Sequence, residues 1–153
     1  MTTLLGIDVG ERRIGLALAD RDGGRAMPLR TLRRATSPIA DAEALARIIG
    51  EHRVVELVVG LPLEASGIEG TQAAATRAWV ESVAPELGLP IAWRDERLSS
   101  HEAERRLGPM KRGRSGGPPT KVQRDAHRAK VDRVAAAIIL QDELDARMTG
   151  DAR

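Results

Sequence analysis

Cysteine, phenylalanine and tyrosine are absent from this chain of 153 residues, and two tryptophans are its only aromatic side chains. Without cysteine there can be no disulfide framework, thiolate zinc site or cysteine nucleophile. No apolar run approaches the roughly 20 residues that a membrane span requires. The first residues also lack the basic and apolar regions of a secretory signal. The sequence therefore predicts a cytoplasmic protein with no membrane-spanning segment.

The composition is sufficient for a folded core. Hydrophobic residues make up 42% of the sequence and charged residues 30%, which argues against global disorder. A chain of this length can bury roughly 70% of the surface that it exposes when unfolded. We therefore expect a single domain over residues 1–153. It would carry one mobile basic loop at about residues 108–121, where glycine, proline and arginine leave little to bury.

Positive charge is concentrated in one part of the chain. Residues 94–133 contain 12 basic and 6 acidic residues, whereas the rest of the chain contains 12 basic and 16 acidic residues. This asymmetry favours a polyanionic partner, and arginine suits phosphate because its planar fork binds two oxygens at once. Charge alone is equally consistent with a solvated basic surface.

The spacing of apolar residues predicts five strands. Three extended segments follow one another through short turns, as in an antiparallel meander. Two further apolar segments are separated by helical patterns, as expected of parallel strands. The five segments cover residues 4–9, 13–19, 26–32, 54–59 and 89–94. The expected fold class is α/β, with a mixed five-stranded sheet (three antiparallel strands, then two parallel ones) flanked by helices.

Four helices are expected between and after these strands. The first begins after Ser37, which has the character of an N-cap and is followed by proline. The second covers residues 71–87, with Pro85 ending or bending it. Ser99 and Glu102 give the signal of a capping box for a third helix, which ends at residue 107. The fourth covers residues 121–148.

Acidic residues occur at three places beside apolar sequence. Asp8 lies inside the first strand, the pair Asp95-Glu96 follows the last strand, and Asp132 lies in the final helix. An ionised carboxylate in such a place is costly unless it is paired, hydrogen-bonded or bound to a metal. Strand periodicity places Asp95 and Glu96 on opposite faces, so one of them is expected to point into a shared site.

Each acid also has a structural interpretation. Asp8 could cap the turn at Gly10, and the Asp95-Glu96 pair could neutralise the arginines on either side of it. Asp132 could pair with Arg128 or Arg133 on its own helix. Taken together, three separated acids that meet one sheet suit hard divalent cations, which prefer oxygen ligands. Two such ions about 4 Å apart can activate a water molecule against a phosphodiester.

Four blocks of the sequence resemble the signature blocks of a known family. They are, in order, GIDVGERRIGLALAD, VVGLPLEASG, DERLSS and KVDRVAAAIILQ. They resemble the blocks of the YqgF/RuvX family, whose members are bacterial pre-16S rRNA nucleases related to Holliday-junction resolvases. The first block alone also resembles actin-like ATPases, but four blocks in order span nearly the whole chain.

This resemblance implies a ribonuclease-H-like fold and a site that depends on Mg²⁺ or Mn²⁺. By motif, the implied catalytic and metal-binding acids are Asp8, Glu96 and Asp132, so the resemblance selects Glu96 over Asp95. Residues expected to contact substrate phosphates are Arg97 and Lys130 within the blocks, and Lys111, Arg112 and Arg114 in the basic loop. Such contacts would give affinity with little sequence readout.

The expected function is that of a metal-dependent nuclease that hydrolyses phosphodiester bonds. The resemblance implies processing of the 5′ end of pre-16S rRNA during ribosome biogenesis, with the small-subunit precursor as a partner. Cleavage of branched DNA is the alternative within this class, and it favours a homodimer over a monomer. A non-catalytic nucleic-acid-binding module would explain the charge but not the three acids. An ATPase of the actin-like kind normally needs two such domains.

Overall fold

The computed structural model describes residues 2–113 and 115–150 and contains a five-stranded sheet in the order β3-β2-β1-β4-β5. The strands are β1 (Thr3–Val9), β2 (Arg13–Asp20), β3 (Met27–Arg33), β4 (Val54–Leu61) and β5 (Ile91–Asp95). The first three pair antiparallel, β4 pairs parallel with β1, and β5 pairs parallel with β4. The expected mixed sheet is therefore confirmed.

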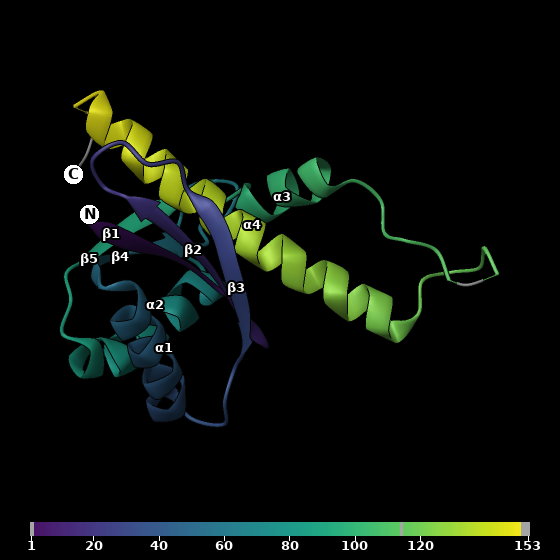
Figure 1. Ribbon diagram of the computed structural model, residues 1–153, viewed down its shortest axis with the longest axis horizontal. Coiled ribbons are helices and arrows are strands. Elements are labelled where there is room, and N and C mark those ends of the chain that lie inside the picture. Colours follow the sequence, from purple (N-terminus) through teal and green to yellow (C-terminus); the bar gives the residue numbers. More distant parts are fainter. Residues whose placement is uncertain (1, 114, 151–153) are drawn as a thin grey trace.

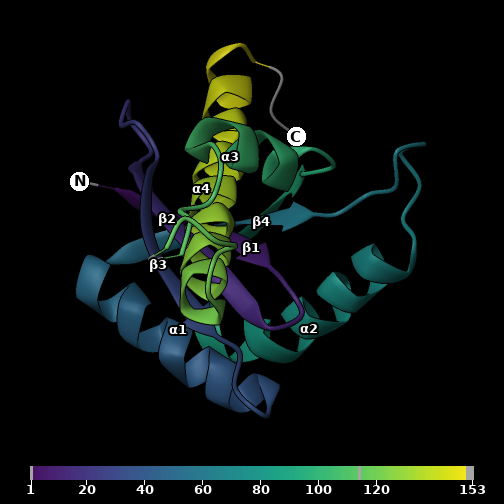
Figure 2. The ribbon, with the colours of Figure 1, turned by 90° about the vertical axis from the view of Figure 1, so that its right-hand side faces the viewer.

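Helices cover the sheet from both sides (Figure 1). They are α1 (Pro38–His52), α2 (Thr71–Leu87), α3 (Ser99–Leu107) and α4 (Lys121–Met148). The helices α1 and α2 lie together on one face, whereas α4 crosses the other face with α3 beside it, as the turned view also shows (Figure 2). None of the helices in the described part of the chain is long and apolar enough to cross a membrane.

Most helix ends agree with the sequence, but the start of α3 does not. Ser37 caps α1, and α2 runs only two residues beyond Pro85 before a left-handed Gly88 ends it. The capping box expected at Ser99 is absent, because α3 begins one residue earlier and has Leu98 as its N-cap. The N–H of Ser99 donates instead to the carbonyl of Glu96, at 3.0 Å, in the tight connection from β5.

Alternate residues of β1 face the two helical layers. Leu5 and Ile7 are buried in a core with residues of α1 and α2, among them Trp79. Leu4 belongs to a second core, which includes Ile139 and Leu140 of α4. Because side chains alternate along a strand, Asp8 lies on the same face of β1 as Leu4, which is the face that α4 covers.

Glycines allow α4 to lie very close to this face. A Cβ atom added at Gly6 of β1 would come within 2.8 Å of the backbone oxygen of Ala136. At Gly15 of β2, an added Cβ would lie 2.0 Å from the backbone oxygen of Asp132. Both distances are shorter than any van der Waals contact, so only glycine fits at these positions. The sequence thus brings the backbone of α4 directly against β1 and β2.

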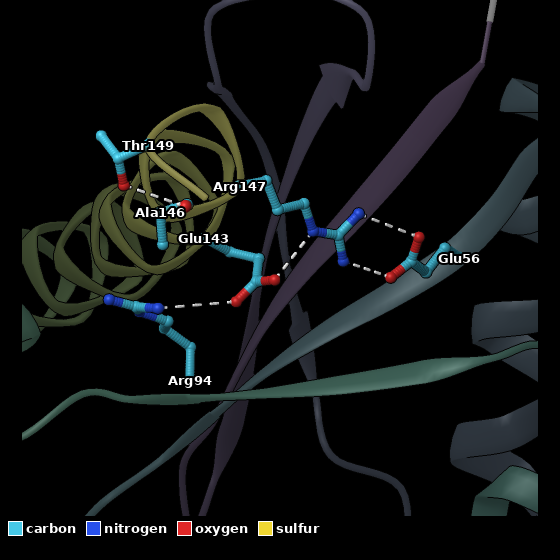
Figure 3. Close-up of polar contacts among 6 residues, drawn as sticks. All are labelled: Glu56, Arg94, Glu143, Ala146, Arg147 and Thr149. Atoms are coloured by element: carbon cyan, nitrogen blue, oxygen red, sulfur yellow. Dashed lines mark hydrogen bonds and ion pairs between the residues drawn. The ribbon is translucent and has the colours of Figure 1, made fainter. Parts of the chain in front are cut away.

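The C-terminal part of α4 is fixed to the sheet by an ion-pair network, which Figure 3 shows. Arg147 donates through Nε to Glu143 at 2.8 Å and makes a bidentate pair with Glu56 of β4. Glu143 is buried, and its other oxygen lies 3.7 Å from a guanidinium nitrogen of Arg94 on β5. The network therefore joins α4 to two strands.

Replacing Arg147 should destabilise the protein. In Arg147→Ala the buried Glu143 carboxylate keeps only the longer contact with Arg94, and we expect a loss of about 2–4 kcal/mol in the free energy of unfolding. Urea denaturation followed by circular dichroism measures this difference. The exposed pair of Arg105 with Glu102 provides the control, since Arg105→Ala should leave the midpoint unchanged. Equal midpoints for both variants would contradict the assignment.

Candidate active site

Asp8 lies at the carboxyl end of the central strand, facing α4. It pairs across the ladder with Gly15 of β2, and it is only 7% exposed. The turn that follows is closed by the backbone, because the N–H of Gly10 donates to the carbonyl of Arg13 at 2.8 Å. The turn has its own backbone hydrogen bond, so a capping role does not account for the burial of this carboxylate.

Glu96 is brought next to the end of β1 by the path of the chain after β5. Its backbone N–H donates to the carbonyl of Leu61 at 3.1 Å, so the chain folds over the end of β4. Gly60 leaves the space for the side chain, since an added Cβ there would lie 3.1 Å from the Glu96 carboxyl carbon. Glu96 is buried, whereas Asp95 is exposed and paired with Arg97 at 2.8 Å.

Asp132 reaches the same region from α4. Its Oδ2 accepts a hydrogen bond from Nε of Arg13, at 2.6 Å, and both side chains are partly buried. Arg133, one of the two partners considered from the sequence on the same helix, instead donates to the hydroxyl of Thr31 at 3.3 Å. Arg13 was missed by sequence reasoning, because it lies 119 residues from Asp132 and begins an ordinary amphipathic strand.

The three carboxyl groups act on one another. Burial raises the pKa of Asp8 to about 6, and the nearby charge of Asp132 adds to this effect. Burial raises the pKa of Glu96 to about 10, and the charge of Asp8 is the next cause. The direct interaction of these two carboxyl groups lowers the pKa of Asp8 and raises that of Glu96. Burial raises the pKa of Asp132 as well, against the opposing charge of Arg13.

The donor set suits a hard divalent cation. Asp8 and Glu96 are buried close together, where a cation would compensate both carboxylates, and every donor atom is an oxygen. Within residues 2–113 and 115–150, however, no three acidic or histidine side chains are grouped as ligands of one ion. One oxygen of Asp132 is held by Arg13, so its full participation requires that contact to open.

The predicted phosphate contacts occupy different places. Arg97 is close to Glu96 in sequence but is held by Asp95, and it also donates to the carbonyl of Ala65 at 3.2 Å. Lys130 is exposed on α4, two residues before Asp132, and therefore leaves the helix on a different side. Lys111 and Arg112 are exposed in the segment between α3 and α4, and Arg114 lies outside the described residues.

A cavity of about 630 Å³ adjoins Glu96 between the end of β5, α3 and α4. Its lining includes the arginines Arg97 and Arg106 and the carboxylates of Glu102 and Asp142. The charges of its walls are therefore mixed. The cavity leaves Glu96 within reach of a bound molecule.

The sequence also matches known proteins. The sequence model of RuvX, described as Holliday junction resolvase, matches residues 2–146. The chain belongs to the RuvX family. A protein of Chloroflexus aggregans named "Putative pre-16S rRNA nuclease" is 43% identical over 145 residues, which cover 95% of this chain and 94% of that protein. A protein of Myxococcus xanthus with the same name is 40% identical and covers 96% of this chain and 90% of its own length.

Solved structures identify the fold of this RuvX family member. RuvC of Thermus thermophilus, in complex with a Holliday junction substrate, superimposes with a TM-score of 0.55 at 16% identity, covering 100% of this chain and 99% of RuvC. A second Thermus thermophilus RuvC structure gives a TM-score of 0.56 at 15% identity, with 99% of each chain covered. The ribonuclease-H-like fold that the resemblance implied is therefore confirmed.

Proposed function

We propose that this protein is a metal-dependent nuclease that hydrolyses phosphodiester bonds in the 5′-end processing of pre-16S rRNA. The observation that carries the proposal is that the buried carboxyl groups of Asp8 and Glu96 lie close together beside Asp132, at the carboxyl ends of the strands. Membership of the RuvX family and the names of the relatives support the substrate class. Cytoplasmic ribosome maturation is the matching cellular setting.

The chain's own residues divide into two roles. Asp8, Glu96 and Asp132 would hold Mg²⁺ or Mn²⁺, which when bound lowers the pKa of a water molecule and stabilises the leaving oxygen. Arg97 and Lys130 would contact phosphate backbone, and so would Lys111, Arg112 and Arg114 of the basic loop. Such contacts position a nucleic acid without reading its sequence.

Cleavage of branched DNA is the second candidate function. It is favoured by the description of the family and by the superposition on RuvC. Two strands of a junction must be cut at matching positions, so this function calls for a homodimer, whereas end processing can be performed by a monomer.

One experiment tests both functions. The wild-type protein and Asp8→Asn are incubated at fixed salt with a labelled pre-16S 5′ fragment and with a four-way DNA junction, in Mg²⁺, Mn²⁺ or EDTA. We expect cleavage of the RNA by wild type with either metal and none in EDTA or with the variant. Glu43→Gln, on the far layer in α1, is the matched control and should cleave normally. Preferred cleavage of the junction would select the second candidate.

Arg13 should compete with the metal for Asp132. Arg13→Gln removes the guanidinium from the acid cluster and leaves its negative charge less compensated. We therefore expect Mn²⁺ to bind several-fold more tightly to the variant. Tighter binding to the native state gives a larger thermal shift, because ligand stabilisation grows with the logarithm of affinity. A thermal-shift titration with MnCl₂ measures this, with the exposed neighbour Arg12→Gln as the control. Weaker binding by Arg13→Gln would show that Arg13 instead orders the site.

A further inference from the structure

The N-terminal part of α4 extends beyond the layers that it helps to form. Figure 1 shows the helix continuing past the edge of the sheet toward the segment that joins it to α3. The first buried residue of α4 is Val131, ten residues after the helix begins. Contact with the sheet starts only near Ala129, whose carbonyl accepts a hydrogen bond from Thr31. Two turns of helix therefore form without burying apolar surface.

This free part is nevertheless well formed. Thr120 and Gln123 make a reciprocal capping box, with hydrogen bonds of 2.8 and 3.1 Å. The Gln123 amide also donates to the carbonyl of Arg112 at 2.8 Å, which ties the preceding segment to the helix. A capping box stabilises a helix end independently of core packing. The chain thus presents a capped helical arm (residues 121–130) to solvent.

Positive charge on the arm lies in line with Asp132. Helical spacing places Lys121, Arg124 and Arg128 on one stripe that continues, four residues later, to Asp132. All three basic side chains are exposed. Among the ion pairs of the described residues, none involves Lys121 or Arg128. Asp125 is the acid near this stripe, so the stripe keeps a net positive charge.

We infer that this stripe is a track for one nucleic-acid strand leading away from the site of cleavage. The inference takes the class of partner, a nucleic acid, from the proposed function. It adds the path of the strand along α4 and the length of that path. At 1.5 Å per residue, Lys121 lies about 16 Å along the helix from Asp132. At a rise of about 3.4 Å per nucleotide, this distance corresponds to four or five nucleotides on one side of the scissile phosphate.

Because the chain has no cysteine, a single introduced cysteine can be labelled specifically to test where RNA lies. Val122 is 78% exposed on the arm, and Ile39 is 62% exposed on α1 in the opposite layer. The variants Val122→Cys and Ile39→Cys are each labelled with a benzophenone maleimide and irradiated with a 12-nucleotide single-stranded RNA in EDTA. We expect at least tenfold more cross-linked RNA from position 122. Equal yields from both positions would overturn the inference.

Charge removal supplies a second readout. Lys121→Gln/Arg128→Gln should lower the salt dependence of RNA binding, in anisotropy titrations without metal, by about 1.4 in the log–log slope. The matched double variant Arg21→Gln/Arg47→Gln, away from the arm, should leave the slope unchanged. An unchanged slope in both would overturn the inference. If the wild-type protein does not cleave the RNA but position 122 still cross-links to it, the proposed nuclease would be refuted and the track would remain.

Discussion

Glu96→Gln should abolish cleavage of the pre-16S fragment while making the metal-free protein more stable. Removal of one of the carboxylates proposed to hold the metal should cost several kcal/mol of transition-state stabilisation, which corresponds to at least ~1,000-fold in rate. The gain in stability has an electrostatic cause. In the folded state Glu96 is buried against Asp8, so ionisation of either carboxyl group opposes folding once no cation is present.

The direction of this effect on stability follows from how the free energy of unfolding changes with pH. The pKa values of Asp8 and Glu96 are raised in the folded state, so the stability they contribute is complete below about pH 4 and is lost as the pH rises through their folded pKa values. Between pH 4 and pH 8 the wild type should therefore lose several kcal/mol of stability in EDTA, and Glu96→Gln should lose less, because only Asp8 remains to titrate in the pair.

Denaturation in urea at the two pH values measures the difference, and a cleavage assay on the same preparations measures activity. Glu43→Gln serves as the control, since an exposed glutamate on α1 should change neither quantity. A variant that keeps cleaving would remove Glu96 from the site. A variant less stable than wild type at pH 8 would show that the buried pair supports the fold rather than opposing it.

Gly15→Ala should damage both the fold and the site through a single methyl group. The added carbon would lie 2.0 Å from the backbone oxygen of Asp132 and 2.9 Å from the nitrogen of Arg133, and neither atom belongs to a flexible side chain. The helix α4 must therefore shift away from β2. Overpacking of this kind costs about 3 kcal/mol. Displacement of Asp132 should also lower cleavage at least ~100-fold, because a shift of about 1 Å in a reacting group has that effect.

A helical glycine in open space provides the comparison. Gly50 on α1 has no atom within 4 Å of an added Cβ, so Gly50→Ala should raise the stability by up to about 1 kcal/mol and leave cleavage unchanged. Thermal unfolding and initial cleavage rates of the two variants give the contrast. A stable, active Gly15→Ala protein would mean that the close approach of α4 to β2 is not required.

Local patterns in the sequence were enough to predict the elements and their order. The short turns between the first three strands specify antiparallel neighbours, and the helices between later strands specify parallel ones. The ends of the helices were harder to predict, as the start of α3 shows. Its start depends on the tight connection that buries Glu96, and this connection cannot be predicted from a Ser-x-x-Glu spacing. The prediction at Ser99 failed because tertiary burial of a neighbour determined where the helix begins.

The candidate site was predictable only in part. Acids inside apolar segments identified Asp8 and Asp132, and the resemblance to a family, not periodicity, selected Glu96. The contact of Arg13 with Asp132 depends on the register of β2 under α4, which no local pattern gives. The glycines beneath α4 were visible in the sequence, but their role becomes clear only when the opposing backbone is known.

The order of elements has a consequence during protein synthesis. Asp8 leaves the ribosome well before the helix that covers it and carries Asp132, because β1 precedes α4 in the chain. Until then the central strand, with its buried carboxylate, lacks one of its two covering layers. A nascent or truncated chain that ends before α4 therefore lacks an acid of the proposed metal site. Translation itself thus delays assembly of the proposed nuclease until α4 has been made.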